Sequence, residues 1–465
     1  MVTIDQVQFT KVASPEVSRP EAPVLISDKT YQLHFERLRK AMAEAGLDAV
    51  VIYADKEHGD NFYFFTGWEP RFEEAALVVR LAGTSAMVLG NEMYKMHQYS
   101  RLAVKPILCP YFSLPNQPME GERPMSEVWA QSGLLEGDTV GLIGWKMFTS
   151  ATADNELLFD MPYFWVQSIQ KAIGDEGHLK NAAHLLIDPD HGIRTTLEAD
   201  EIAYYENNAA LASLCIQDLL YDLKPGANER ELANHLVAYG QTTPCHPMCA
   251  TGERFNGAQV SPRDKIVQLG DRFTTSMSLR GGLTCRAAYV AHGPQDLPEE
   301  TQDYVDALAR PYFAAVATWY ETIGLGVTGG QLYDAIEQVF PKEAYGWFLN
   351  PGHLCASEEW MSSPFSKSSA DTLKSGMILQ MDIIPSMAPY ASTNAEEGVA
   401  LADEALRRQL ETEYPALWQR VQQRRAYMME ELGIRLKPEV LPLSNLAACV
   451  RPFLLDREMG LKVVR

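Results

Sequence analysis

The chain has 465 residues, of which 46% are hydrophobic and 22% are charged, and this length exceeds what one hydrophobic core usually serves, so we expect two domains. Its formal net charge of -21 argues against nucleic acid and anionic membranes as partners, because both require clustered Lys and Arg. The sequence shows neither an apolar stretch long enough to cross a membrane nor a signal-peptide pattern, which predicts a cytoplasmic protein.

The N-terminal half has the pattern of an α/β domain. Residues 1–28 lack helical or strand periodicity, and we expect them to form an arm on the surface or on a partner. Apolar residues then recur at helical spacing from Tyr31 to Leu47, and a buried-strand run follows at residues 49–53. Further strand-like runs occur at residues 75–79, 86–89 and 139–143. We therefore predict an α/β domain over residues 29–190.

The C-terminal half contains a unit that occurs twice. Thr196 is expected to cap a long helix that ends near Leu223, and a short helix and strands follow. A second helical stretch leads to a matching short helix and matching strands. Two such units related by a pseudo-twofold axis can bury their sheets under their helices, which gives an α/β (α+β) domain over residues 191–445. Residues 446–465 are predicted to be a C-terminal tail.

The two copies differ at one chemically important position. The first copy leads through Gly270 to Ser276, and the second leads through Gly376 to Asp382. Position for position, Ser276 stands where Asp382 stands. An acidic position that can bind a metal ion is thus filled in only one copy.

The cysteines do not form an obvious framework. The seven are odd in number and scattered, which favours reduced thiols over disulfides. Cys245, His246 and Cys249 suggest a zinc site, but no second ligand pair follows at finger spacing. Cys285 and Cys355 are candidate nucleophiles, although the sequence shows no positioned base for either, and buried inert thiols are the alternative.

Several segments together resemble a known family. The marks are residues 35–50, 61–68, 194–202, 260–271, 351–353, 375–382 and 395–401, in this order. This pattern resembles the pita-bread fold shared by creatinase, prolidase, aminopeptidase P and methionine aminopeptidase, with the additional N-terminal domain of the first three. The resemblance covers nearly the whole chain from Tyr31 to Asp403 and implies a hydrolase-like site in the C-terminal domain.

The resemblance implies a degenerate metal site. Metallopeptidases of this family hold two divalent ions with two Asp, one His and two Glu. Carried onto this chain, the Asp positions fall on Ser276 and Ala287, the His on His353, and the Glu pair on Asp382 and Glu396. Since serine and alanine cannot replace carboxylates, we expect no dinuclear centre. A single divalent ion on His353, Asp382 and Glu396 is the alternative to a site with no metal.

The creatinase mechanism does not transfer intact either. The histidine that acts in creatinase falls on Gln259, which cannot exchange protons near neutral pH, and the family's second active-site histidine falls on Trp360. His353 is therefore the best candidate for general acid or base, and a structural hydrogen bond is its alternative role. Asp382 and Glu396 either bind a cationic group of the substrate or form ion pairs with Arg280 or Arg286.

Other side chains are candidates for binding a substrate. Arg286, next to the vacated position Ala287, can offer a fixed cation to a carboxylate or an oxyanion, or it neutralises Asp382 or Glu396. The remaining candidates are Ser276, Gln259, Arg280, Tyr289, Trp360 and His246, with core packing as the alternative for the aromatic rings. Glu358 and Glu359 are assigned to a solvated stretch.

The N-terminal domain is expected to complete the site of a second copy. In dimeric relatives, the segment after residues 61–67 reaches the neighbouring active site. Here that segment carries Trp68, which can close the pocket, and Arg71, which can hold a substrate carboxylate. An ordinary packed loop is the alternative. The resemblance thus predicts a homodimer.

Three functions compete at this stage. The leading one is a metal-independent, creatinase-like hydrolase or lyase that cleaves a C–N or similar bond of a small zwitterionic, amino-acid-like substrate, with no cofactor. The second is an Xaa-Pro-type peptidase that keeps one metal ion. The third is an inactive pita-bread protein that serves as a binding or scaffold module. The first two require a small-molecule substrate, and they differ in bound metal.

Overall fold

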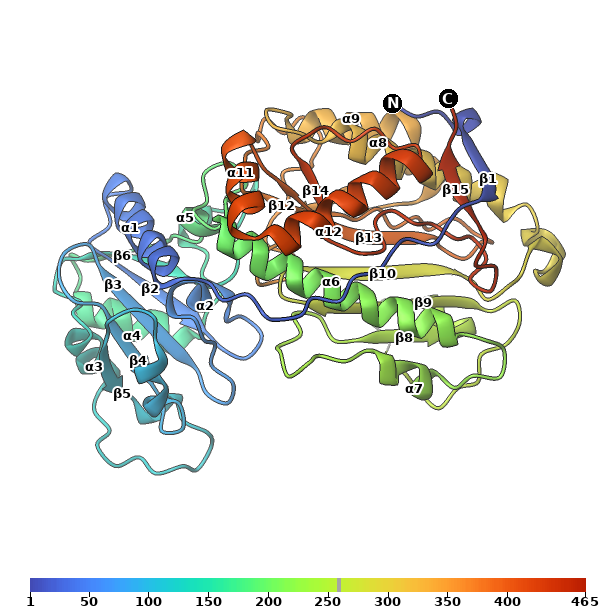
Figure 1. The fold of residues 1–465 in the computed structure, drawn as a ribbon. Helices are drawn as coiled ribbons and strands as arrows, with labels where there is room; N and C mark the ends of the chain where they lie inside the picture. The colour runs from blue at the N-terminus through green and yellow to red at the C-terminus, as the bar shows by residue number, and fades with distance from the viewer. Residues whose placement is uncertain (257–260) are drawn as a thin grey trace. The chain divides into compact units, whose positions relative to one another are not determined.

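The computed structural model describes residues 1–256 and 261–465, and it divides into two compact units. One unit is Ile26–Thr195, and the other combines Met1–Leu25 with Thr196–Arg465. Figure 1 shows both as layers of helices and strands. Within the described residues, every helix is too short or too polar to cross a membrane.

The unit Ile26–Thr195 is built on a mixed six-stranded sheet with the order β5-β4-β3-β2-β6-β7. Its strands are β2 (Ala49–Ala54), β3 (Ala75–Arg80), β4 (Ala86–Leu89), β5 (Lys105–Leu108), β6 (Thr139–Ile143) and β7 (His178–Asn181). Its helices are α1 (Asp28–Glu44), α2 (Asp60–Thr66), α3 (Met125–Gln131), α4 (Tyr163–Ile173) and α5 (His184–Ile187). Trp129 and Trp165 fill the core between α3, α4 and the sheet. The strands predicted at residues 49–53, 75–79, 86–89 and 139–143 are confirmed.

The other unit is built on a seven-stranded sheet with the order β11-β12-β13-β10-β9-β8, in which β14 also pairs with β13. Its strands are β8 (Met248–Thr251), β9 (Arg272–Leu279), β10 (Gly282–Tyr289), β11 (His353–Leu354), β12 (Ile378–Met381), β13 (Asn394–Leu401) and β14 (Val440–Pro442). Its helices are α6 (Ala199–Asp222), α7 (Glu229–Leu232), α8 (Arg310–Thr322), α9 (Gly329–Val339), α10 (Lys342–Tyr345), α11 (Glu404–Glu413) and α12 (Pro415–Ala426). The repeat is visible in this sheet, because β9 and β10 come from the first copy, β12 and β13 from the second, and β10 pairs with β13.

The first long helix, α6, begins two residues later than the predicted start. Its N-cap is Glu198, whose backbone N–H donates to the side chain of Glu201 at 2.9 Å, so Thr196 is not the cap. A carboxylate at the first turn also matches the positive end of the helix dipole. Thus the prediction of the helix is confirmed, but its predicted N-terminal boundary is two residues too early.

Helix α6 covers one face of the sheet, and this fixes which strand residues face away from it. Ile216 and Leu219 of α6 pack against Met277 of β9 and Ala288 of β10, and Figure 1 shows α6 running along these strands. Successive residues of a strand point to opposite faces. The neighbouring positions, among them Ser276, therefore point to the face that α6 leaves uncovered.

Both termini are part of the fold. Strand β1 (Val7–Lys11) pairs antiparallel with β15 (Met459–Val463), and the two ends of the chain lie together in Figure 1. The sequence analysis did not predict either strand. Residues 7–11 and 459–463 thus form one small sheet, within the segments that the sequence analysis assigned to an arm and a tail.

Candidate active site

The candidate site lies on the sheet face opposite α6. His353 of β11 pairs with Gln380 of β12, and Asp382 follows directly after that strand. Glu396 of β13 stands directly across from Cys285 of β10. Strand pairing thus brings together His353, Asp382 and Glu396, three residues that the sequence analysis singled out.

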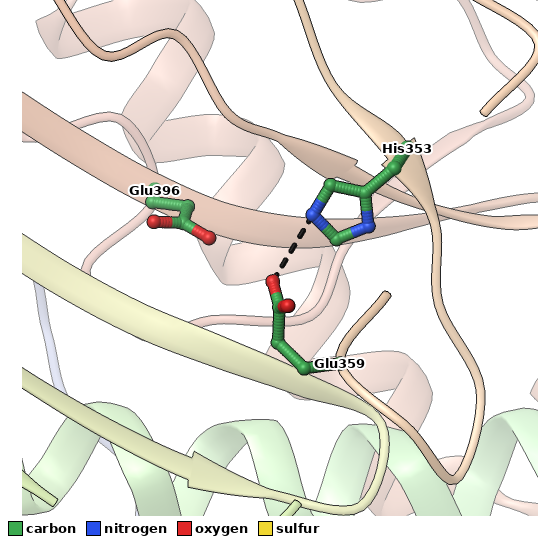
Figure 2. Close-up of side chains that lie close together, drawn as sticks. All are labelled: His353, Glu359 and Glu396. Carbon is green, nitrogen blue, oxygen red and sulfur yellow. Dashed lines mark ion pairs between the residues drawn. The ribbon is translucent and has the colours of Figure 1, made fainter. Parts of the chain in front are cut away.

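His353 is fully buried and is held between polar groups on both sides of its ring. Its Nδ1 lies 3.2 Å from the carbonyl oxygen of Leu354. Its Nε2 lies 3.0 Å from Oε1 of Glu359 and 3.9 Å from Oδ2 of Asp382. Figure 2 shows the imidazole pointing toward Glu359, with Glu396 beside them. A buried imidazole with two carboxylate neighbours suits proton transfer or metal binding.

Glu359 is a site residue that the sequence analysis placed wrongly in a solvated stretch. Leu354 and Ser362 form a bridge, so the segment between them turns back over the strand. The side chain of Glu359 is only 22% exposed and pairs with His353. A loop that folds back in this way leaves no periodicity in the sequence, and the pair of adjacent acidic residues resembled an exposed run.

Three side chains form a compact donor cluster. His353, Glu359 and Glu396 each offer one ligand atom, and these atoms all lie within 4.8 Å of one another. Gln380 donates from Nε2 to Oε1 of Glu396 at 3.3 Å and to the carbonyl oxygen of Leu283 at 2.6 Å. This amide fixes the orientation of the carboxyl group, as outer partners of metal ligands commonly do.

The cluster shifts the pKa values of its members in opposite directions. Burial raises the pKa of Asp382 to about 7, and the charge of Glu359 adds to this effect. Burial and then the charges of Asp382 and Glu359 raise the pKa of Glu396 well above its ordinary value. Three carboxyl groups gathered in one buried space cannot all ionise without a compensating cation.

The imidazole supplies part of that compensation. Burial opposes the charged form of His353, but the charge and hydrogen bond of Glu359 and the charge of Asp382 together raise its pKa. Burial likewise opposes ionisation of Glu359, and the charge of His353 outweighs it, so the pKa of Glu359 is lowered. The two residues thus form an ion pair. Among the described residues, the ion pairs of the cluster then offer one cation, His353, to three carboxyl groups.

The donor set fits one divalent cation. One imidazole nitrogen and carboxylate oxygens from Glu359, Glu396 and the adjacent Asp382 are ligands that zinc, manganese or iron accept. Oδ1 of Asp382 is buried and has no hydrogen-bond partner among the described residues. A buried carboxylate oxygen with no donor is costly unless a ligand or ion satisfies it.

The same face does not fit a pair of cations. Ser276 and Ala287 stand at the two Asp positions that the resemblance implies, and both are buried. The Ser276 hydroxyl has no hydrogen-bond partner in the described part of the chain. Neither side chain carries a charge that offsets a second cation. The loss of the dinuclear centre stays a prediction, because it rests on the same two residues from which it was made.

The thiols near the site are unsuited to nucleophilic attack. Burial and then the charge of Glu396 raise the pKa of Cys285 well above its ordinary value, and burial does the same for Cys355, with Glu359 adding to it. A protonated thiol is a weak nucleophile. Burial raises the pKa of Cys245 to about 11, and the charges of Glu359 and Glu396 contribute.

Arg286 faces the other side of the sheet. It forms an ion pair with Glu397 and donates from Nη1 to the carbonyl oxygen of Cys285 at 2.7 Å. It therefore neutralises neither Asp382 nor Glu396, contrary to the sequence interpretation. Since Arg286 and Ala287 are consecutive residues of a strand, only one of them can face the site.

The other candidates have varied surroundings. Trp360 is 39% exposed, and its ring stacks on that of His353 with the centroids 4.2 Å apart. Tyr289 accepts a hydrogen bond from the backbone N–H of Ala391 at 2.7 Å and packs edge-on against Tyr304. His246 is exposed, Arg280 is half-buried in the turn after β9, and Gln259 lies outside the described residues. Among these candidates, Trp360 stacks on a member of the cluster.

Two candidates belong to the unit Ile26–Thr195. Trp68 is buried and packs edge-on against Phe62, with ring centroids 5.1 Å apart. Arg71 pairs with Glu69 at 3.0 Å. Both side chains thus have partners within their own unit.

The architecture is the two-domain pita-bread fold, as solved structures show. The chain is similar to an Xaa-Pro dipeptidase from Bacillus anthracis, with a TM-score of 0.60 and 15% identity over 80% of this chain and 96% of that one. It is also similar to the prolidase from Pyrococcus horikoshii OT3, with a TM-score of 0.59 and 16% identity over 80% and 95% of the two chains. Dipeptidase PepE from Mycobacterium ulcerans gives a TM-score of 0.61 at 16% identity, over 81% and 94%.

Similarity at this level establishes the fold and its two-domain organisation, and the predicted fold class is confirmed. No protein-family model matches the sequence, and no curated protein does. What the site does must therefore be argued from its own residues.

Proposed function

We propose that this protein is a hydrolase that cleaves a small peptide or amino-acid amide and holds one divalent metal ion. The observation that carries the proposal is the cluster of His353, Glu359 and Glu396, whose ligand atoms lie within 4.8 Å of one another. The proposal differs from the metal-independent reading of the sequence, because Glu359 adds a carboxylate that the sequence interpretation left out.

Electrostatics support one cation. The imidazolium of His353 pairs with Glu359, and the raised pKa values of Asp382 and Glu396 reflect a shortage of positive charge in a buried space. A divalent cation is often the largest local charge in a site and permits neighbouring carboxylates to ionise. Binding should therefore release protons from Asp382 and Glu396 and displace the proton of His353.

The residues then have distinct tasks. His353, Glu359 and Glu396 hold the ion, and Gln380 orients Glu396 through its 3.3 Å hydrogen bond. A bound divalent ion supplies Lewis-acid polarisation of a carbonyl group and lowers the pKa of water. Asp382, which loses its proton when the ion binds, is then a carboxylate beside the cluster that can accept a proton from the substrate.

The substrate class rests on the fold and on the enclosed character of the site. The similar solved structures are named as Xaa-Pro dipeptidases, prolidases and an X-Pro aminopeptidase. A site whose central histidine is fully buried admits a short substrate more readily than a folded protein. We therefore propose dipeptides with a C-terminal proline as the first substrates to test.

A metal-independent reaction is the second candidate, and the paired pKa shifts favour it. His353 gains a proton more readily than an ordinary histidine, and Glu396 keeps its proton far above the ordinary range. Protonated Glu396 can serve as the acid, and the carboxylate of Glu359, whose pKa is lowered, can serve as the base, without a metal. This route would cleave a C–N bond of a small zwitterionic substrate.

Metal analysis combined with turnover distinguishes the candidates. The protein is purified without chelator, its metal content is measured by mass spectrometry, and hydrolysis of Xaa-Pro dipeptides is followed before and after removal of metal by a chelator. About one equivalent of metal, with activity lost on removal and restored on reloading, supports the single-ion hydrolase. Turnover that survives complete removal supports the metal-independent reaction.

The same assay has a clear negative result. No turnover with or without metal, together with ligand binding whose affinity is unchanged in His353→Ala, would point to an inactive binding protein. A matched control is His292→Ala, which removes an exposed imidazole outside the donor cluster. Loss of activity in His353→Ala but not in His292→Ala assigns the chemistry to the cluster.

The proposal includes a homodimer in which Trp68 and Arg71 of one copy reach the active site of the other. Its support is the resemblance described above. Arg71→Ala should raise KM for dipeptides and leave kcat nearly unchanged, because it removes a contact to the substrate carboxylate. Light scattering coupled to size exclusion measures the mass, and a monomer at working concentration would refute the arrangement.

A further inference from the structure

A cavity of about 70 Å³ lies beside strand β10. Its walls come from the end of α6, from the segment 446–457, from Ser14 and Pro15, from Arg286 and Ala287 of β10, and from Asn394 of β13. Arg286 points to the α6 face because it alternates with Cys285 and Ala287, which lie on the site face. None of the cluster residues His353, Glu359 and Glu396 lines this cavity.

Three arginines line the cavity, and two of them have no anionic partner. Arg286 is neutralised by Glu397. Arg451 donates only to the carbonyl oxygens of Met459 and Val12 and to the Ser14 hydroxyl. Among the described residues, it makes no ion pair with a carboxylate.

Arg457 completes this positive group. It donates to the carbonyl oxygen of Tyr221, and its guanidinium lies 5.0 Å from the centre of the Tyr221 ring. It too has no carboxylate partner in the described part of the chain. In a chain with a net charge of -21, two uncompensated guanidinium groups at one cavity mark a site for an anion.

The rest of the wall is apolar, which limits the kind of anion. Leu446 and Leu454 are buried, and Leu220 of α6 lies with them. A strongly hydrated anion such as phosphate would lose its water against these side chains without compensation. A carboxylate with a short hydrocarbon tail satisfies both parts of the wall, since the head group meets the guanidinium groups and the tail meets the leucines.

We propose that this cavity is a binding site for a small apolar monocarboxylate, held by Arg451 and Arg457 through its head group and by the leucine wall through its tail. The proposal does not depend on the chemistry of the His353 cluster. Cys449, which is 7% exposed and lines the same cavity, serves as a reporter of occupancy.

The test compares matched probes by calorimetry. Propionate should bind, and propionamide, which has the same tail without the charge, should bind at least about tenfold more weakly because a charge-assisted hydrogen bond is lost. Inorganic phosphate should compete poorly with propionate. Equal binding of propionate and propionamide, or tighter binding of phosphate, would overturn the assignment.

Variants locate the site. Arg457→Gln changes an exposed residue and should weaken propionate binding about tenfold, whereas Arg408→Gln in α11, outside the cavity, should leave it unchanged. Propionate should also protect Cys449, but not Cys245, from alkylation by iodoacetamide, as measured by peptide mass spectrometry. Unchanged affinity in Arg457→Gln, or loss of affinity in His353→Ala, would refute the cavity as the site.

Discussion

Replacing Asp382 by asparagine tests the electrostatics of the cluster without assuming any activity. The substitution keeps the size of the side chain and removes a buried group whose pKa is raised to about 7. The folded protein holds this proton up to about pH 7, whereas the unfolded chain releases it near the ordinary value of 3.8. Between these values the folded state binds more protons, so the free energy of unfolding falls as the pH rises.

The size of this fall follows from the shift. A change from 3.8 to about 7 corresponds to about 4 kcal/mol in total, at about 1.4 kcal/mol per pKa unit, and about 3 kcal/mol of it falls between pH 5 and pH 8. Glu396 and His353, whose pKa values are also raised, lose stability in the same direction as the pH rises. The lowered pKa of Glu359 gives stability that is lost only in acid, below this window.

Urea unfolding of the metal-stripped protein at pH 5 and pH 8 measures the difference. The free energy of unfolding of the wild-type protein should fall by about 3 kcal/mol more than that of Asp382→Asn over this pH interval. Hydrogen exchange in β12 and β13 assigns the change to the unit that contains Thr196–Arg465. Glu404→Gln, an exposed carboxylate in α11, is the control and should behave as wild type. The same pH dependence in wild type and Asp382→Asn would refute the electrostatic reasoning.

Three further changes probe separate parts of the arrangement. Glu359→Gln should lower the pKa of His353, which an NMR titration of the imidazole measures. It should also reduce the affinity for metal at least about tenfold, because ligands and their outer partners commonly contribute this much. An unchanged titration would contradict the ion pair. Ser276→Asp combined with Ala287→Asp returns two carboxylates to the site face and should raise the metal content from about one to about two equivalents. Mass spectrometry that still finds about one equivalent of metal would contradict the proposed geometry. Arg286→Ala breaks a buried ion pair and should lower the free energy of unfolding, measured with urea, by about 3–5 kcal/mol. A decrease of less than about 1 kcal/mol would show that the pair is not buried in solution.

The sequence predicted the strands and the main helices well because their periodicity is local. The strand runs at residues 49–53 and 139–143 and the long helix before Leu223 all lie where the structure has them, with small boundary differences. Strands β1 and β15 could not be predicted in this way, because each is short and its partner lies at the other end of the chain. Pairing over such a distance leaves no local pattern.

Of the candidate site, the sequence predicted only the residues that lie on strands or directly after them. His353, Asp382 and Glu396 lie on or directly after strands, and the resemblance to the pita-bread fold located them. Glu359 lies in a loop that turns back over His353, so its role depends on the bridge between Leu354 and Ser362. Nothing in the adjacent acidic pair distinguishes such a loop from a solvated one.

The alternation of residues along strand β10 is enough to place Arg286 correctly. If Ala287 faces the site, its neighbour Arg286 must face the opposite side, and its ion pair with Glu397 confirms this placement. The positive charge that the sequence interpretation assigned to the active site therefore belongs to the α6 face. The site face carries carboxyl groups and one imidazole, and this favours a cation as its ligand.

The asymmetry between the two copies supports the proposal of a single cation. His353, Glu359, Asp382 and Glu396 all come from the second copy of the repeat. The first copy contributes Ser276, whose backbone pairs with Cys285, which in turn stands across from Glu396. Neighbouring strands lie about 5 Å apart, so Ser276 stands about 10 Å from Glu396 across the sheet, where a second cation would need a carboxylate. Neutral groups at that end leave the negative charge concentrated around His353, and this charge distribution favours the proposed single ion over a pair.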